Sequence, residues 1–208
     1  MSKDAVFRPA RAGDEAAAYH VCLKTGDAGG DGETIFREDP DALGRLFVGP
    51  YLAFAPELAL ILEDAAGVCG YALAALDSRA FYARYEAEWR PDLCARYPEP
   101  QGDPSTWTRV EEVYGWYHHP DYFCPEPYDR YPSHLHIDLL PRAQGHGHGR
   151  RMMEGLMERL RQHGSPGVHL GMWARNERAH AFYVRLGFHE LARVGSTEDG
   201  SIYMGKRL

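Results

Sequence analysis

Two short stretches of the sequence carry residue types that could do chemistry. The first, AQGHGHGRR at 143–151, alternates glycine with histidine and ends in two arginines. The second, HLHID at 134–138, places two imidazoles and a carboxylate at alternate positions. Glycine loops bind phosphate, whereas imidazoles with a carboxylate bind metal ions or move protons. The two stretches therefore predict different chemistries.

The glycine-rich stretch has the composition of an anion-binding loop. A glycine turn that opens a helix gathers unpaired N–H groups and the positive end of the helix dipole around one point. Gly145, Gly147 and Gly149 would let the main chain approach a phosphate, and Arg150 and Arg151 would attract it. A P-loop is excluded because no lysine follows these glycines, and a dinucleotide fingerprint is excluded because Arg150 replaces its third glycine.

The hydrophobic pattern predicts the elements that position these residues. Residues 133–140, SHLHIDLL, alternate as a strand does, and the methionine- and leucine-rich run after the glycine loop has helical spacing. A second strand is predicted at 167–174, followed by a helix capped by Asn176 and closed by Gly187. The order strand, loop, helix, strand, helix predicts two neighbouring parallel strands.

The remaining elements are expected around this unit in a single domain over 1–208. We expect a strand at 5–10, helices over 13–26 and about 40–54, a hairpin of 58–64 with 70–77, and strands at 189–194 and 201–208. Residues 78–132 are rich in tyrosine, tryptophan and proline, which predicts an ordered insertion, partly helical around 80–96 and 105–118.

Composition limits the classes of function. With 208 residues and 44% apolar residues, the chain can bury one sizeable core. A formal charge of −7 argues against nucleic acid as a partner. The absence of an export signal and of a long apolar run predicts a cytoplasmic protein without a membrane partner. The scattered cysteines fit buried thiols in a reducing compartment; they are Cys22, Cys69, Cys94 and Cys124.

Two motifs in order carry a family resemblance. Gln144, Gly147 and Gly149 fit the pattern Q-x-x-G-x-G, and NERAHAFYVRLGF begins at Asn176, 27 residues after Gly149. The pair resembles the signatures of the GNAT superfamily of N-acetyltransferases. Within it, SHLHIDLLP and SPGVHLGM resemble the acetyltransferase-like C-terminal domain of O-GlcNAcase and its bacterial relatives. The resemblance implies an α/β fold with a mixed, mostly antiparallel central sheet flanked by helices, in which two parallel central strands splay apart.

The resemblance also implies a cosubstrate and a set of binding residues. Acetyl-CoA would donate its acetyl group to an amine acceptor, a small molecule or a peptide, by direct attack in a ternary complex. Carried over by motif, the coenzyme-binding positions are Leu139, Leu140, Gln144, Gly145, His146, Gly147, His148, Gly149, Arg150, Asn176, Ala179, Phe182 and Tyr183. Leu139 and Leu140 would bond pantetheine through their main chain, and the two loop histidines would point their side chains outward.

Catalytic roles follow for two residues. Tyr183 falls on the position of the family's general acid, where a phenol could protonate the departing thiolate, although a core tyrosine would fit the same pattern. Asp138 is the first candidate for the base that takes the amine proton, and a structural carboxylate fits equally well. Weaker candidates for the base lie in the insertion: Glu111, Glu112, His118 and His119.

Two other classes of function stay open on the sequence alone. His134, His136 and Asp138 spell H-x-H-x-D, as in metal-dependent hydrolases, but Leu139 stands where that motif continues with histidine, so no metal site is predicted. The more ordinary interpretation of these residues is a partly exposed polar strand face. The fold could also persist as a non-catalytic binding module. The aromatic insertion could form the acceptor site, cover the sheet or make a homodimer contact.

Overall fold

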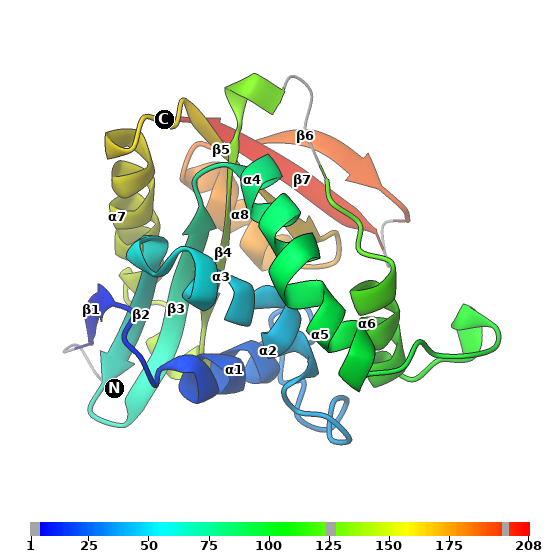
Figure 1. The fold of residues 1–208 in the computed structure, drawn as a ribbon. Helices are drawn as coiled ribbons and strands as arrows, with labels where there is room; N and C mark the ends of the chain where they lie inside the picture. Colours follow the sequence, from blue (N-terminus) through cyan, green and yellow to red (C-terminus); the bar gives the residue numbers. More distant parts are fainter. Residues whose placement is uncertain (1–4, 124–127, 197–199) are drawn as a thin grey trace.

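The computed structural model describes residues 5–123, 128–196 and 200–208 and contains one seven-stranded sheet (Figure 1). The strands follow the order β1-β2-β3-β4-β5-β7-β6, and every neighbouring pair is antiparallel except β4 with β5. Their bounds are β1 Val6–Pro9, β2 Ala59–Asp64, β3 Gly67–Ala75, β4 Ser133–Leu139, β5 Gly167–Trp173, β6 His189–Val194 and β7 Ser201–Arg207. The predicted mixed, mostly antiparallel sheet is confirmed.

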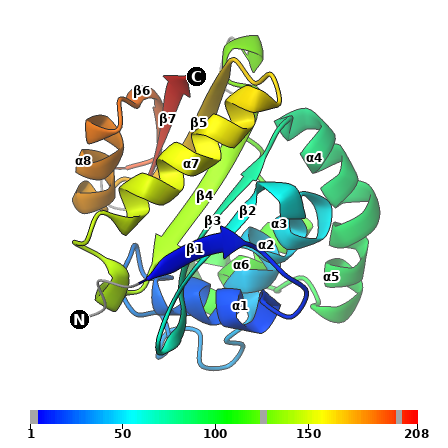
Figure 2. The ribbon, with the colours of Figure 1, turned by 90° about the vertical axis from the view of Figure 1, so that its left-hand side faces the viewer.

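Helices cover both faces of the sheet (Figure 2). One face carries α7 (His148–Gln162) and α8 (Glu177–Arg185). The other face carries α1 Glu15–Lys24, α2 Ala42–Phe47, α3 Gly49–Phe54, α4 Ser78–Arg84, α5 Arg90–Arg96 and α6 Arg109–His118. Five residues in π-helical conformation, Tyr85–Trp89, join α4 to α5. No helix within the described ranges combines the length and the apolar character that a membrane crossing requires.

The predicted helix over 40–54 is two helices. Val48 separates α2 from α3 and has a non-helical φ of −126°. Pro50 then stands in the first turn of α3, where a missing N–H costs nothing. The predicted insertion is helical where expected, and it lies with α1 to α3 on the same face of the sheet (Figure 1). Of the cysteines, Cys124 lies outside the described residues.

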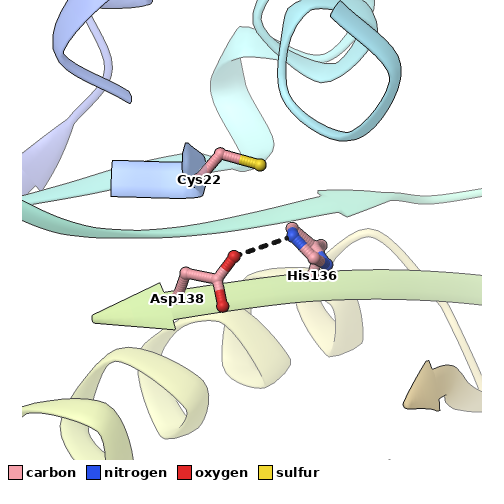
Figure 3. A group of neighbouring side chains, drawn as sticks. All are labelled: Cys22, His136 and Asp138. Atoms are coloured by element: carbon pink, nitrogen blue, oxygen red, sulfur yellow. Dashed lines mark ion pairs between the residues drawn. The ribbon is translucent and has the colours of Figure 1, made fainter. Parts of the chain in front are cut away.

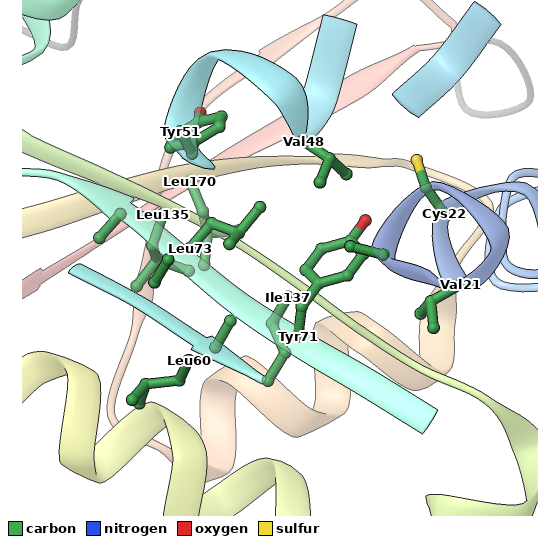
Figure 4. Close-up of a cluster of buried hydrophobic side chains, with 14 of the residues drawn as sticks. Val21, Cys22, Val48, Tyr51, Leu60, Tyr71, Leu73, Leu135, Ile137 and Leu170 are labelled. Carbon is green, nitrogen blue, oxygen red and sulfur yellow. The ribbon is translucent and has the colours of Figure 1, made fainter. Parts of the chain in front are cut away.

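The core is built on β3 and β4, the middle of the sheet (Figure 4). Leu135 and Ile137 point from β4 toward the face covered by α7, whose buried residues include Met152 and Leu156. Tyr71 on β3 lies on the opposite face, beneath α1, and is fully buried. Helices cover both faces of the central strands. A polar side chain buried there is therefore stable only when it has hydrogen-bond partners.

The parallel pair in the centre is short. β4 and β5 pair at two positions only, Ser133 with Val168 and His134 with His169. At the closed end of the pair, the Ser133 hydroxyl lies 2.5 Å from the Leu76 carbonyl and 2.7 Å from the Ser165 hydroxyl. Beyond His134, β4 continues to Leu139 without a further registered pair to β5 among the described residues. The predicted splaying of the central strands is therefore present.

Helix α1 is held close to α2 by a glycine. A Cβ added at Gly44 would lie 2.4 Å from the ring of Tyr19, which is buried on α1. A Cβ added at Gly155 on α7 would instead meet only Phe7, at 3.9 Å, an ordinary contact. These two helical glycines form a matched pair for mutation. Alanine improves helix propensity at both sites, but its methyl group fits only at Gly155.

We expect Gly44→Ala to lower the free energy of unfolding by about 1–3 kcal/mol, because the new methyl group overpacks the α1–α2 contact. Gly155→Ala should instead raise it by roughly 0.5–1 kcal/mol through helix propensity. Urea denaturation of both variants measures the difference. Equal effects of the two substitutions would contradict the close α1–α2 approach.

Candidate functional site: the open end of the β4–β5 pair

The glycine loop opens α7 in the way the sequence predicts. Gly145 and Gly147 have φ values of +80° and +78°, which non-glycine residues rarely adopt. Gly147 is the N-cap of the 15-residue α7, and no side chain caps the first N–H groups of that helix. The helix therefore presents uncapped N–H groups together with the positive end of its dipole.

Gly149 serves packing between elements. A Cβ at this position would lie 3.4 Å from the ring of Phe182 on α8 and 3.6 Å from Leu139 on β4. The start of α7, the end of β4 and one face of α8 therefore converge at Gly149. These three elements carry most of the coenzyme-binding positions that the resemblance implies.

His148 differs from the expectation for its side chain. The sequence predicts that both loop histidines point outward, and His146 is exposed, but His148 is only 2% exposed. Its Nδ1 accepts a hydrogen bond of 2.6 Å from Arg151, and its Nε2 is buried without a partner. The first turn of α7 rotates position 148 inward, next to the buried Met152 and Met153 face, so the prediction for His148 is wrong.

The end of β4 supplies fewer free main-chain groups than predicted. The N–H of Leu140 donates to the Cys69 carbonyl at 2.8 Å, and its carbonyl accepts from Ala143 at 2.8 Å. The carbonyl of Leu139 accepts from the side chain of Gln144 at 2.6 Å. The flexible side chain of Gln144 can move away and free the carbonyl of Leu139. The N–H and the carbonyl of Leu140, in contrast, both bond to backbone groups. Of the two leucines, Leu139 is the one that can offer main-chain groups to a ligand.

Helix α8 positions the predicted general acid. Asn176 caps the helix by accepting a hydrogen bond of 3.0 Å from the N–H of Ala179. Tyr183 lies two turns along, 8% exposed, with its ring against Phe182 and Phe188. Burial, with the negative charge of Asp138 as a smaller cause, raises the pKa of the Tyr183 phenol. The phenol therefore keeps its proton throughout the physiological pH range.

On the polar face of β4, His136 pairs with Asp138 (Figure 3), and a residue of β3 extends this pair into a small hydrogen-bonded network. Tyr71 stands directly opposite Asp138 in the antiparallel register and donates to its Oδ2 at 2.5 Å. His136 Nε2 lies 3.0 Å from the same Oδ2 and 3.0 Å from the Tyr71 hydroxyl. Asp138 and His136 stand out in the sequence but Tyr71 does not, because a tyrosine in an apolar strand gives no signal of its partner.

Cys22 on α1 adds a thiol next to this network (Figure 3). One ligand atom each from Cys22, His136 and Asp138 lies within 4.8 Å of the others, a spacing that could hold a metal ion. The hydroxyl of Tyr71 bonds both His136 and Asp138, so hydrogen bonding already accounts for their proximity. Burial raises the pKa of the Cys22 thiol, which disfavours the thiolate that a metal requires.

His134 does not join the other two members of the H-x-H-x-D motif. It is 4% exposed, its Nδ1 lies 2.7 Å from the Ser78 hydroxyl, and its ring stacks on Tyr82 at 4.9 Å. Burial lowers the pKa of His134 well below the usual value, so the imidazole is neutral. The expectation of a partly exposed polar face is therefore wrong for His134 and holds for His136 and Asp138, which are 30% and 22% exposed.

The insertion reaches the network indirectly, through an aromatic ring on α2. Phe47 on α2 stacks on His136 with ring centroids 5.6 Å apart, and Trp116 on α6 meets Phe47 edge-on at 6.4 Å. The weaker candidates for the base have local partners instead. Glu111 closes the capping box of α6, Glu112 pairs with Arg109, His118 contacts the Tyr97 carbonyl, and His119 pairs with Glu99.

Comparison with known proteins agrees with this geometry. Residues 71–188 match the model of the acetyltransferase (GNAT) family, and the solved structure of SsHAT is 40% identical, with a TM-score of 0.87 and 98% of each chain covered. The chain therefore belongs to the GNAT family of acetyltransferases.

Two further comparisons report proteins to which the chain is similar. Protein O-GlcNAcase of Rattus norvegicus is 28% identical over 209 residues, which is 100% of this chain, and the chain spans 22% of that relative's length. A GNAT superfamily phosphinothricin acetyltransferase from Sinorhizobium meliloti, solved in complex with acetyl-CoA, shares the fold at 15% identity, with a TM-score of 0.54 and 98% and 88% of the two chains covered.

The Asn176 cap provides a stability test. We expect Asn176→Ala to lower the free energy of unfolding by about 0.5–2 kcal/mol, because the Ala179 N–H loses its acceptor. Asn176→Asp keeps an acceptor oxygen and serves as the matched control. Thermal or urea denaturation measures both variants, and an alanine variant as stable as the aspartate variant would show that the cap contributes nothing.

Proposed function

We propose that this protein transfers the acetyl group of acetyl-CoA to an amine acceptor at the open end of the β4–β5 pair. The observation that carries the proposal is the divergence of two parallel strands directly beside an uncapped helix N-terminus. The diverging strands leave one edge of β4 without a partner strand, and the helix terminus offers N–H groups for a diphosphate. Membership of the GNAT family supports the same assignment.

The coenzyme side of the site is formed by the glycine loop, Leu139 and α8. In this proposal the N–H groups of residues 145–150 bind the diphosphate, and the main chain of Leu139 bonds the pantetheine after Gln144 moves aside. Leu140 contributes its side chain, because its main chain is already bonded. Arg150 pairs with Glu154 on the surface at 2.7 Å and adds a positive charge near the loop. Phe182, Ala179 and Asn176 complete the wall on α8.

The reaction is direct attack of the amine nitrogen on the thioester carbon. The N–H groups of the splayed strand stabilise the negative oxygen of the tetrahedral intermediate. The carbon–sulfur bond then breaks, and Tyr183 protonates the thiolate or donates a hydrogen bond to it. Its raised pKa keeps that proton in place until sulfur carries charge. Asp138 lies on the other side of the site from Tyr183 in this proposal, where the proton of the amine is accepted.

The acceptor approaches from the face covered by α1, α2 and the insertion. His136 and Asp138 point to that face, and Phe47 with Trp116 adds aromatic surface beside them. Such a wall suits the aliphatic stem of an amine in a small molecule or a peptide. Cys22, Cys69 and Cys94 are free thiols, which supports a cytoplasmic location.

Acetyl-CoA binding tests the coenzyme side. We expect a hundredfold excess over the Kd to raise the free energy of unfolding by about 2.7 kcal/mol. Gly147→Ala should weaken binding, since alanine at a φ of +78° costs about 1–2 kcal/mol and distorts the loop. Gly164→Ala is the matched control, because Gly164 has a φ of +85° at the other end of α7 with the same open space around it. Equal loss of binding in both variants would contradict the assignment of the loop.

The turnover rate tests the role of Tyr183 as general acid. We expect Tyr183→Phe to lower kcat roughly tens- to thousands-fold, the range that general acid catalysis contributes, with acetyl-CoA binding retained. Release of free CoA with a panel of amines and peptides measures the rate. Tyr85→Phe removes a second buried hydroxyl, one without a partner and outside the coenzyme side, and should leave turnover unchanged. An unchanged rate in Tyr183→Phe would remove the phenol from the mechanism.

A further inference from the structure

The network on β3 and β4 fixes the position of each of its protons. Tyr71 is fully buried, and burial with the neighbouring Asp138 charge raises the pKa of its phenol well above 10, so the hydroxyl keeps its hydrogen. That hydrogen is donated to Asp138 Oδ2 at 2.5 Å. The Tyr71 oxygen is then left as an acceptor for any other partner.

The other groups next to the Tyr71 oxygen among the described residues are the Cys22 thiol and His136. Its Nε2 lies 3.0 Å from the Tyr71 oxygen and 3.0 Å from Asp138 Oδ2. Both of those oxygens can only accept here, so Nε2 must carry a hydrogen. A neutral imidazole has one N–H, and Nδ1 of His136 is therefore the nitrogen with the free lone pair.

The imidazole of His136 is partly open. Its side chain is 30% exposed, and among the described residues no hydrogen bond is made to its Nδ1. The ring itself is held between Phe47 and Tyr71, with centroids 5.6 and 5.5 Å away and interplanar angles of 21° and 29°. The lone pair thus has a fixed direction.

His136 also stands at the right place along β4. It follows His134, the last residue paired with β5, by two positions on the same face of the strand. It is therefore the first side chain on the acceptor face beyond the point where the strands part. Asp138 precedes Leu139 on β4, and a Cβ at Gly149 would contact both Leu139 and Phe182, the neighbour of Tyr183 on α8.

We propose that Nδ1 of His136 accepts the proton of the attacking amine, and that Asp138 and Tyr71 are positioning residues that hold its tautomer. The inference rests on the proposed function and deepens it. As the carbon–nitrogen bond forms, the amine proton moves to Nδ1; as the carbon–sulfur bond breaks, the Tyr183 proton moves to sulfur. Exchange with solvent restores both groups, so one proton passes in net from nitrogen to sulfur.

The test variant replaces the imidazole of His136 and keeps a hydrogen bond to Asp138. In His136→Gln the side-chain amide can still donate to Asp138 but is no base at neutral pH. We expect kcat/KM to fall about 10²- to 10⁴-fold, the range of general base catalysis, with the acetyl-CoA thermal shift retained as proof of folding. His180→Gln is the matched control, because His180 also pairs with a carboxylate, Glu190, at 2.7 Å, is likewise 30% exposed, and should keep full activity.

The pH profile distinguishes the imidazole from the carboxylate. The titratable groups that face His136 are Asp138, Tyr71, the Cys22 thiol and the buried His134, with Phe47 as an uncharged neighbour. A base is lost when it is protonated, so kcat/KM of the wild type should fall on the acidic side of its pH profile. Asp138→Asn should lower the rate and keep that acidic limb, whereas His136→Gln should lose it.

Three outcomes would overturn the assignment. Turnover of His136→Gln within about threefold of the wild type, with Asp138→Asn inactive, would make the carboxylate the base. Loss of activity on treatment with a chelator, restored by zinc, would make Cys22, His136 and Asp138 a metal site. Wild-type protein that binds acetyl-CoA and acetylates no amine would reject the proposed function itself, and this inference with it.

Discussion

The site depends on the early separation of β4 from β5. Two registered pairs and the bonds of Ser133 hold the strands together at one end, and beyond His134 no further pair forms among the described residues. Backbone groups inside a protein need partners, so an unpaired strand edge near the core favours a ligand with its own donors and acceptors. In the function proposed above, the amide-rich pantetheine arm of the coenzyme would meet that need.

The two faces of β4 carry different kinds of side chain. Toward α7 the strand presents apolar side chains, and the coenzyme side that we propose lies there with Gly149 and Phe182. Toward α1 it presents His136 and Asp138, where the acceptor would enter. Strand alternation therefore separates the binding of the acyl donor from proton transfer within a few residues of chain.

The insertion is part of the architecture of the site. Tyr82 and Phe81 on α4 pack around His134, and Trp116 on α6 contacts Phe47, which holds the ring of His136. Aromatic rings bury much area and lose little side-chain entropy, so a segment broken by prolines can still form a firm wall. The same residues thus give stability to the parting strands and shape to the acceptor face.

The local features follow from the sequence alone. Strand alternation, the helical period of α7, the glycine loop before it and the Asn176 cap all depend on neighbours within a few residues, and the structure has them where the sequence predicts them. The division of residues 40–54 into two helices and the inward side chain of His148 required the tertiary structure, as did the partners of His136. Those features depend on contacts across elements, and His136 meets the Tyr71 hydroxyl, 65 residues away in sequence, through a strand register that no local pattern contains.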